Sequence, residues 1–410
     1  MFRLIGEHLR SEGMSVFRIN FCAGDWLHWH GTGCSSFKGT SSDWPEFIES
    51  YLSRNGITDL VLHGDQRIYH RTAVAKAREK GIHVAVTELG ALRPGWMTLE
   101  RNGLSTLSHF PDDPDAIRGI SDSAGPVDLS PMFPSSFWLQ TAPDVVYNLL
   151  NVFLAPLYPA YERHTIYPPI SEYARGAVRL FGEKARTTRA ERDIRHLQAA
   201  GTRYFVLPLQ LEGDFQLRRH SPYDSFAQVL ESVFGSLAEA APAETHIVLK
   251  SHPLDVGFEN WAAVVEELTA KYGLNGRVHY LDGGGLAAPL SEAAGVVTLN
   301  STAGLEALQA GLPVKTLVPA HYDIEGLTHQ GDLAGFWKAP HQPDADLLNA
   351  YVNALALTTQ VRGSIHNSDG VRVAARNIAA RVAARALNPF GAYVDPPPRL
   401  EKARKLGVPL

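Results

Sequence analysis

Cysteine, long hydrophobic runs and a surplus of one charge are all scarce or missing in this 410-residue chain. Its two cysteines, Cys22 and Cys34, are too few for a disulfide framework and lack metal-ligand spacing, so we expect free thiols in a reducing compartment. No apolar run reaches the roughly 18 residues that a membrane span requires, and the first residues carry no signal-peptide pattern. These absences predict a cytoplasmic protein.

The charge and the missing motifs exclude further classes of function. A formal charge of -5 provides no basic field, so we expect no nucleic-acid partner. The sequence has no Walker loop, no GxSxG and no GxGxxG after a strand. Its 17 histidines are scattered, and even His28 and His30, which flank Trp29, join no ligand-like cluster. We therefore expect neither a catalytic metal nor a bound cofactor.

What the chain does have is a regular alternation of strand-like and helix-like segments. With 410 residues, 45% of them hydrophobic, it has room for two domains. The alternation predicts an α/β fold of two Rossmann-like domains that face each other across a cleft, which is the GT-B-like architecture. We place the first domain at residues 1–190 and the second at 191–390. Residues 391–410 form a basic tail, which we expect to be solvated; contact with a membrane surface is the alternative.

The opening of the first domain departs from this pattern. Residues 2–12 predict an amphipathic helix, and residues 15–21 predict a strand. A Rossmann-like domain normally begins with a strand that leads into such a helix, and here that first strand is apparently absent. Either translation begins upstream of Met1, or the domain lacks a central element.

The other elements follow from apolar runs and their stop signals. The first half predicts strands at 58–63 and 83–87, a helix at 72–79, a loop at 103–136, short proline-broken helices at 138–173 and a charged helix at 174–200. The second half predicts strands at 204–209, 246–249, 278–281, 295–299 and 314–318, helices between them, and a terminal helix at 368–387.

Polar residues follow three predicted strands of the second domain, at points where ligands collect in an open α/β sheet. The first block, Asn300-Ser301-Thr302-Ala303-Gly304, follows a strand and opens a helix. Free N–H groups and the helix dipole suit an anion such as a nucleotide phosphate, and the hydroxyls of Ser301 and Thr302 add donors. Plain helix capping is the alternative.

The second block is Lys250-Ser251-His252-Pro253. Pro253 disfavours helical geometry at His252, which keeps the imidazole at the rim of the sheet. A lysine and a histidine at one strand end can neutralise phosphate oxygens, and the histidine can also donate a proton to a leaving group. An ordinary strand-to-turn exit is the alternative.

The third block is Gln210-Leu211-Glu212-Gly213-Asp214. If it is extended, Gln210, Glu212 and Asp214 lie on one side, where two close carboxylates perturb each other's pKa values and can divide acid and nucleophile roles. Glycosyl transfer with retention can use such a carboxylate as nucleophile. A solvated acidic loop is the alternative.

The first domain offers weaker patterns at its own strand ends. Gly64-Asp65-Gln66-Arg67 follows one strand, and Glu88 ends the next, with Arg93-Pro94 behind it. From that position Glu88 can act as a general acid or base that faces the cleft.

Taken together and in this order, the blocks resemble the capsular polysaccharide synthesis proteins of the KpsS/LipB type over residues 1–330. The motifs that carry the resemblance are Arg18-Ile-Asn20-Phe with Gly24-Asp25, Gly64-Asp65-Gln-Arg67 with His70-Arg71, Glu88 with Arg93-Pro94 and Thr98-Leu-Glu100, Gln210-x-x-x-Asp214, His252-Pro253, and Asn300-Ser-Thr-x-Gly304. The chain departs from the family pattern at the absent first strand, at the Thr-Glu-Leu-Gly context of Glu88 and at Tyr161-Glu-Arg-His164.

The resemblance implies a GT-B-like, metal-independent transferase that moves 3-deoxy-D-manno-octulosonic acid (Kdo) from CMP-Kdo with retention. The implied acceptor is a phosphatidylglycerol-type lipid or a growing Kdo linker. Asp214 would be the nucleophile and Glu88 the acid/base. The residues that would hold the CMP phosphate and the sugar carboxylate are Lys250, His252, Ser301 and Thr302, with His252 also a catalytic candidate. The further substrate-binding candidates in the motifs are Gln210, Asn300, Gly304, Arg67 and Arg93.

The resemblance also implies capsule assembly and export proteins as partners and a peripheral position on the inner face of the inner membrane. Two other functions fit the same architecture. One is a sugar-nucleotide epimerase or other UDP-sugar enzyme, and the other is a non-catalytic accessory protein of capsule polysaccharide export.

Overall fold

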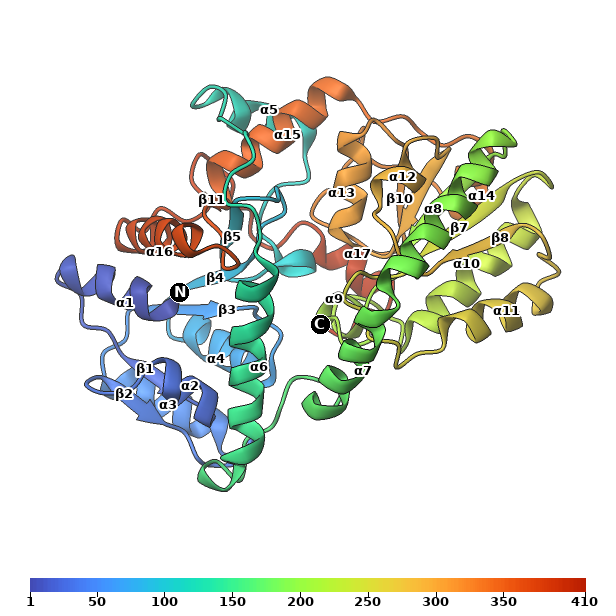
Figure 1. The fold of residues 1–410 in the computed structure, drawn as a ribbon. Coiled ribbons are helices and arrows are strands. Elements are labelled where there is room, and N and C mark those ends of the chain that lie inside the picture. The colour runs from blue at the N-terminus through green and yellow to red at the C-terminus, as the bar shows by residue number, and fades with distance from the viewer. The chain divides into compact units, whose positions relative to one another are not determined.

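The computed structural model describes all 410 residues and divides them into two compact units, each built from separate segments of the chain (Figure 1). Unit 1 contains Met1–Pro111, Gly119–Ile170 and Tyr351–Pro398. Unit 2 contains Asp112–Arg118, Ser171–Ala350 and Arg399–Leu410. The predicted domains at 1–190, 191–390 and 391–410 therefore need correction, because residues 171–190 group with unit 2 and residues 351–390 return to unit 1.

Unit 2 is built on a five-stranded parallel sheet in the order β10-β9-β6-β7-β8. Its strands are β6 (Tyr204–Pro208), β7 (His246–Lys250), β8 (Val278–Leu281), β9 (Gly295–Thr298) and β10 (Val314–Thr316). All five were predicted. The residues of β6 are fully buried, as expected of a central strand that helices cover on both faces. The chain places its first strand in the middle, the next two on one side and the last two on the other, which is the doubly wound order.

Helices of unit 2 cover this sheet and bury an aliphatic and aromatic core that includes Phe205, Leu230 and Phe234. The helices are α7 (Pro169–Phe181), α8 (Glu183–Ala199), α9 (Phe215–Arg218), α10 (Phe226–Ala240), α11 (Trp261–Lys271), α12 (Ala287–Leu290), α13 (Thr302–Gln309), α14 (Leu333–Lys338) and α17 (Leu400–Lys405).

Unit 1 contains two sheets. The larger, mixed sheet has the order β11-β5-β4-β3, with β3 (Asp59–His63) and β4 (His83–Leu89) parallel and β5 (Trp96–Arg101) and β11 (Gln360–Arg362) added antiparallel. The smaller sheet pairs β1 (Arg18–Asn20) with β2 (Cys34–Ser36) in parallel. Both cysteines are free, as predicted.

The helices of unit 1 form a layer on each face of the larger sheet. Val84 and Val86 of β4 pack with α3 and α4 on one face, whereas Met97 and Leu99 of β5 pack with α1 and α16 on the other. The helical segments are α1 (Phe2–Ser11), α2 (Ala23–His28), α3 (Trp44–Arg54), α4 (Ile68–Glu79), α6 (Phe137–Phe153) and α16 (Ser368–Ala383), with 3-10 turns at Ser105–Leu107 and Ala155–Leu157. Two further helices, α5 (Pro114–Asp122) and α15 (Ala345–Thr358), have residues in both units.

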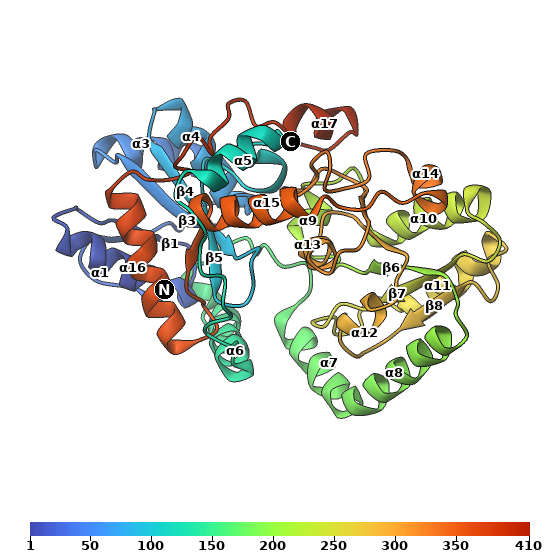
Figure 2. The same cartoon turned by 90° about the horizontal axis from the view of Figure 1, so that it is seen from above.

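The first element of unit 1 is helix α1, which begins at Phe2. That helix lies along α16, so segments more than 350 residues apart in sequence are neighbours in both views (Figures 1 and 2). Ile5 and Leu9 of α1 share a core with Ala375 and Ile378 of α16. The terminal helix expected at 368–387 exists, but it completes unit 1 instead of the second domain.

The C-terminal segment is not the solvated basic tail that we predicted. Arg399 is only 2% exposed, and its guanidinium donates to the carbonyls of Ala320 and His321. Lys402 of α17 forms an ion pair of 2.6 Å with the buried Asp323. These two contacts attach the segment to the rest of unit 2, whereas Arg404 and Lys405 are exposed.

None of the helices combines the length and the apolarity that crossing a bilayer demands.

Candidate functional site

The three polar blocks of unit 2 lie at one edge of its sheet. Strands β9, β6 and β7 are adjacent and parallel, so their carboxyl ends point the same way. The strand order reverses between β6 and β9, and doubly wound folds bind ligands in the crevice outside such a switch point. Gln210 follows β6 and Asn300 follows β9, so these two side chains stand on either side of it.

Gln210 and Asn300 are joined across the switch point. The side-chain nitrogen of Gln210 donates to Oδ1 of Asn300 at 3.3 Å, and Nδ2 of Asn300 donates to the carbonyl of Gln216 at 3.1 Å. Gln210 is only 3% exposed, yet its Oε1 has no hydrogen-bond partner. A buried acceptor without a partner is costly, so this atom is suited to receive a donor group from a ligand.

Asp214 lies next to this pair, at the start of α9. Its Oδ1 accepts a hydrogen bond of 2.9 Å from the backbone N–H of Gln216, the residue whose carbonyl also holds Asn300. This fixes one carboxylate oxygen and orients the other. Residues Gln210, Asp214 and Asn300 are therefore brought together as one cluster.

Glu212 does not join this cluster, and the expected extended segment with both carboxylates on one side is wrong. The chain turns at residues 212–213, and Oε1 of Glu212 accepts a hydrogen bond of 2.8 Å from the N–H of Phe226 at the start of α10. Burial raises the pKa of Glu212, and the hydrogen bond from Phe226 acts to lower it. Each carboxylate caps a different helix.

His252 lies at the rim of the sheet beyond β7, outside any helix, as its position before Pro253 predicted. Its Nδ1 accepts a hydrogen bond of 3.1 Å from the N–H of Leu254. In its neutral form the imidazole then carries its proton on Nε2.

Lys250 is the buried last residue of β7. Its ammonium donates to the carbonyl of Ser251 at 2.7 Å and to the Ser251 hydroxyl at 3.4 Å. Burial lowers the pKa of Lys250 to about 8, while Asp282 acts to raise it and Arg179 to lower it. These neighbours place the ammonium on the β8 side of β7, one strand away from the switch point.

The helix α13 opens directly after Asn300. Ser301 is its N-cap, and its Oγ accepts from the N–H of Ala303 at 3.2 Å, so the capping alternative describes this hydroxyl. Thr302 is half-buried in the first turn. Gly304 has a packing reason, because a Cβ there would collide with the ring of Tyr322, whose hydroxyl donates to the carbonyl of Ser301.

In unit 1, Glu88 lies near the end of β4, beside the end of β3. Its Oε1 pairs with Nε2 of His63 at 3.5 Å and accepts from the N–H of Leu89 at 3.0 Å. Burial lowers the pKa of His63, and Glu88 partly opposes that shift. A carboxylate next to an imidazole at parallel strand ends can exchange a proton with a substrate.

The two arginine candidates of unit 1 occupy different surroundings. Arg67 precedes α4; burial is the main reason that the pKa values of His63 and His70 are lowered, and the charge of Arg67 adds to this effect. Arg93 is exposed, and its Nε donates to the carbonyl of Gly90 at 2.9 Å. Arg67 and Glu88 therefore both lie close to His63, whereas Arg93 contacts the turn after β4.

Sequence reasoning missed His63 as a member of this group. The signal was present, because His63 and Glu88 end two consecutive strands, and the register pairs His63 with Thr87. It also left Asp65 without a role of its own: the structure buries Asp65, where its carboxylate accepts from the N–H of Leu104 at 3.0 Å, and burial raises its pKa to about 6. That contact stabilises a loop.

These features define a protein of the doubly wound α/β class with a polar, anion-compatible site at the switch point of unit 2. A family model described as "Capsule polysaccharide biosynthesis protein" matches residues 58–366. The chain belongs to this family. The resemblance inferred from the short motifs is thereby confirmed.

Two relatives match nearly the whole chain. The capsule polysaccharide export protein KpsS of Escherichia coli is 31% identical over 362 residues, which cover 88% of this chain and 92% of KpsS. The capsule polysaccharide modification protein LipB of Neisseria meningitidis serogroup B is 31% identical over 373 residues, 89% of each chain. Among solved structures, the β-Kdo 2,4 transferase KpsC of Thermosulfurimonas dismutans is similar at 14% identity and a TM-score of 0.40, over 89% of this chain and 99% of that one.

Proposed function

We propose that this chain is a glycosyltransferase that moves Kdo from CMP-Kdo to a lipid or glycolipid acceptor, with retention at the anomeric carbon. The observation that carries the proposal is the cluster of Gln210, Asp214 and Asn300 at the switch point, where doubly wound folds bind nucleotides. Membership of the capsule polysaccharide biosynthesis family supports sugar transfer as the reaction at such a site.

The donor half of the site must stabilise the charge that develops as CMP leaves. CMP departs as a phosphate monoester, and preorganised donors are the efficient way to stabilise an anion. The first turn of α13, the hydroxyl of Thr302 and the Nε2–H of His252 supply such donors. Lys250 adds a positive charge at the end of β7. The unpartnered Oε1 of Gln210 would accept from a hydroxyl of the sugar.

We assign the nucleophile to Asp214. In the first step a carboxylate oxygen of Asp214 attacks the anomeric carbon C2 of Kdo, and the C2–O bond to the phosphate breaks with its electron pair, so that CMP leaves. In the second step the acceptor hydroxyl attacks C2 of the Kdo ester and frees the carboxylate. Two inversions give net retention.

The second step needs a base that takes the proton of the acceptor hydroxyl. We assign this role to Glu88, whose contact with Nε2 of His63 and hydrogen bond from the N–H of Leu89 hold the carboxylate in place. The charge of Arg67, close to His63, suits an anionic group on the acceptor. The scheme uses only groups of the chain and of the two substrates, and none of its steps includes a metal ion.

The proposed acceptor is a lipid, which requires work at a membrane surface. Helix α6 supports this, because Trp138 is 73% exposed, Phe153 is 71% exposed and Phe137, next to Trp138, is 53% exposed. Exposed aromatic side chains on a helix can enter the boundary of a bilayer. We therefore propose a peripheral position on the inner face of the inner membrane, with capsule assembly and export proteins as partners that take up the product.

The direct test is incubation of the purified chain with CMP-Kdo and phosphatidylglycerol vesicles. The proposal predicts release of CMP together with a lipid whose mass grows by Kdo units. Interconversion of UDP-sugars would instead support an epimerase. If neither CMP-Kdo nor UDP-sugars are turned over and the chain binds specifically to export proteins, the result would support an accessory protein and contradict the proposal.

A further inference from the structure

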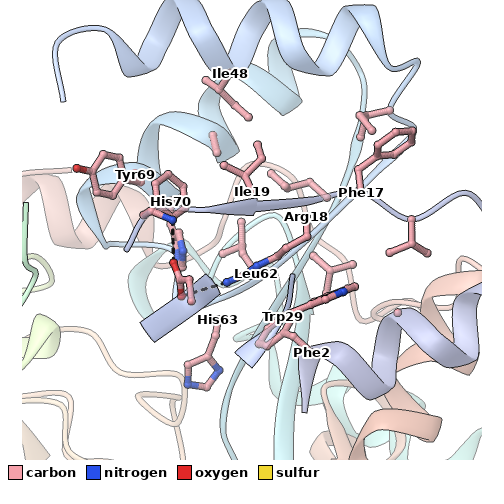
Figure 3. A pocket seen from close by; sticks show the side chains of 18 of the residues that line it. Phe2, Phe17, Arg18, Ile19, Trp29, Ile48, Leu62, His63, Tyr69 and His70 are labelled. Carbon is pink, nitrogen blue, oxygen red and sulfur yellow. Dashed lines mark hydrogen bonds and ion pairs between the residues drawn. The ribbon is translucent and has the colours of Figure 1, made fainter. Parts of the chain in front are cut away.

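Two apolar features of the molecule lie outside the switch point of unit 2. One is an open pocket of about 860 Å³ in unit 1, where Ile19 and Leu62 lie near His63 (Figure 3). Because His63 lines it, this pocket belongs to the unit 1 site already described. The other is the outer face of α7, which belongs to unit 2 from Ser171 onward and has no role in the proposed transfer of Kdo.

The outer face of α7 is apolar. Ala174, Val178 and Phe181 follow one another at spacings of four and three residues, so they form one stripe along the helix. All three side chains are exposed, Val178 to 72% and Phe181 to 93%. An amphipathic helix of a globular protein normally turns such a stripe towards the core. In α7 this orientation is reversed, and a contiguous exposed apolar stripe marks an interaction surface.

The opposite face of α7 attaches the helix to unit 2 through arginines. Arg175 donates to the carbonyl of Gly257 at 2.8 Å, and the central carbon of its guanidinium lies 4.7 Å from the centre of the Phe258 ring. Arg179 forms an ion pair with Asp282. These contacts hold the polar face on the protein, so the apolar stripe stays turned outward.

The same contacts place α7 at the edge of the sheet that carries the candidate site. Gly257 lies in the loop after β7 and Asp282 directly follows β8, so both lie beyond the carboxyl ends of parallel strands. The ends of β6 and β9, which Gln210 and Asn300 follow, point to the same side. A surface that binds the outer face of α7 therefore lies close to the edge of unit 2 at which the donor would bind.

Basic side chains follow the apolar stripe. Residues 169–199, which span α7 and α8, contain seven Lys or Arg and four Asp or Glu, a surplus of three positive charges in a chain whose formal charge is -5. Lys184 and Arg189 of α8 are exposed, whereas Arg186 between them turns to Asp282 at 3.6 Å. An apolar stripe beside basic side chains matches a bilayer of anionic lipids, where acyl chains lie beneath negative headgroups.

We propose that α7 is an interfacial helix that docks unit 2 on an anionic phospholipid bilayer. Val178 and Phe181 enter the acyl boundary, and Lys184 and Arg189 contact the headgroups. The proposal rests on the proposed function, which places the acceptor in a membrane. It adds a membrane contact in unit 2 that is separate from α6 of unit 1, and it brings the edge of the sheet that carries the donor site close to the lipid.

Flotation of vesicles in the absence of CMP-Kdo measures this contact. The full chain should bind phosphatidylglycerol vesicles at least about tenfold more tightly than phosphatidylcholine vesicles, and this preference should fall as the salt concentration rises. Val178→Ser combined with Phe181→Ser should weaken binding to phosphatidylglycerol vesicles at least about tenfold, because two apolar side chains are lost from the bilayer. The matched control, Leu406→Ser, changes a side chain that is 42% exposed on unit 2 outside α7 and should leave binding unchanged. Unchanged binding of the double variant would overturn the proposal.

The charges of α8 are tested by Lys184→Glu combined with Arg189→Glu. This variant should lower binding to phosphatidylglycerol vesicles at least about tenfold and leave the weaker binding to phosphatidylcholine vesicles unchanged. The control is Lys338→Glu combined with Arg404→Glu, which makes the same change of charge at exposed positions of α14 and α17 and should retain the binding. Equal losses in the two charge variants would contradict a specific surface on α7 and α8.

Radical footprinting of the full chain identifies what covers the stripe. Phe181 should be labelled strongly in solution and protected when phosphatidylglycerol vesicles are added, while Leu406 should be labelled equally in both conditions. Protection of Phe181 without vesicles would assign the stripe to unit 1 or to a second copy, which would overturn the proposal. A chain that binds vesicles through α7 but moves no Kdo would contradict the proposed function alone. A chain that moves Kdo while vesicles leave Phe181 unprotected would contradict the interfacial helix alone.

Discussion

At the scale of single residues, Asp214 has two roles that must be separated. One oxygen caps α9, which is a structural role, and we propose that the carboxylate is also the nucleophile. Asparagine caps helices as well as aspartate does, but its amide is not a nucleophile for an anomeric carbon. One substitution, Asp214→Asn, should therefore remove the nucleophile and keep the helix cap.

Asp214→Asn should lower the rate of Kdo transfer by about 10³-fold or more while the melting temperature stays unchanged. The rate is measured as CMP release in the presence of the lipid acceptor. The control is Glu212→Gln, which keeps a carbonyl oxygen for the N–H of Phe226 and should retain most of the activity. Full activity of Asp214→Asn would reduce Asp214 to its capping role.

Lys250 gives a pH dependence with a defined sign. With the pKa of this lysine lowered to about 8 by burial, the ammonium is mostly charged at pH 7 and mostly neutral at pH 9. If it binds the phosphate of CMP, affinity should fall as pH rises through this range, approaching about tenfold per pH unit. Calorimetric titrations with CMP measure this directly.

The matched variants for this test are Lys250→Arg and Lys250→Met. The guanidinium stays charged, so the affinity of Lys250→Arg should be nearly independent of pH, and Lys250→Met should bind weakly at every pH. If the affinity of the wild-type chain for CMP does not change between pH 7 and 9, the ammonium does not bind the phosphate and only donates to the carbonyl of Ser251.

The sequence predicted which strand ends bring the candidate site residues of unit 2 together, and it did so for a physical reason. Parallel strands place their carboxyl ends at one edge, so Gln210 and Asn300 were foreseeable as neighbours. The side chain of Glu212 was not foreseeable in the same way. Its direction depends on a turn at residues 212–213 and on the N–H of Phe226, 14 residues away, which no local pattern reveals.

At the scale of elements, the position of α13 depends on Gly304, which has no side chain to keep Tyr322 away. Gly304 lets Tyr322 approach the helix closely enough for its hydroxyl to hold the carbonyl of Ser301. The helix start that we assign to phosphate binding therefore depends on a contact from residue 322. A substitution on the buried face of α13 should affect stability and donor binding together.

Gly304→Ala should lower the free energy of unfolding by about 1–3 kcal/mol, because the new methyl group overlaps the Tyr322 ring. The control is Gly119→Ala in α5, where a Cβ meets no atom within 4 Å and should be neutral or stabilise by up to about 1 kcal/mol. Thermal or urea unfolding measures both. Equal effects of the two substitutions would contradict the close approach of Tyr322.

The exposed aromatic residues of α6 provide a test of membrane contact. Trp138→Ser and Phe153→Ser together should weaken binding to phosphatidylglycerol vesicles by at least about tenfold, because each buried aromatic side chain contributes about 1.5–3 kcal/mol. Flotation of vesicles is the measurement. Phe390→Ser, which removes an aromatic residue that is 50% exposed outside α6, is the control. Unchanged binding of the double variant would separate α6 from the membrane.

Helices and strands were predictable where apolar residues recur at a regular spacing or where glycine and proline mark the ends of a segment. The five strands of unit 2 contain or adjoin short apolar runs bounded by loop residues, and all five were predicted. Helix α3 was overlooked, although its buried residues Trp44, Ile48 and Leu52 recur at a helical spacing. Helix α6 was predicted as short pieces because of Pro143, yet one 17-residue helix passes through that proline.

At the scale of the whole molecule, the chain leaves unit 1 and returns to it. Residues Tyr351–Pro398 supply β11 and α16, which complete the sheet and the core of a unit that starts at Met1. Alternation of strands and helices along the sequence gives no sign of such a return. The predicted boundary at residue 190 and the assignment of 368–387 to the second domain failed for this reason.

Ile378→Ala tests the discontinuous domain. The side chain is fully buried between α16 and α1, so its truncation should cost about 2–5 kcal/mol and raise hydrogen exchange in β4 and β5 while β6 and β7 remain protected. Arg376→Ala, at an exposed position of the same helix, should change neither. Loss of protection in unit 2 instead of unit 1 would contradict the assignment of α16.

The account as a whole rests on a covalent intermediate at the switch point of unit 2. The most direct measurement is mass spectrometry of the chain after incubation with CMP-Kdo in the absence of an acceptor. The account predicts a mass gain of one Kdo residue, carried by the peptide that contains Asp214 and lost when acceptor lipid is added. An adduct on Glu212 or Glu88, or acceptor-dependent turnover in which no adduct forms on Asp214, would contradict it.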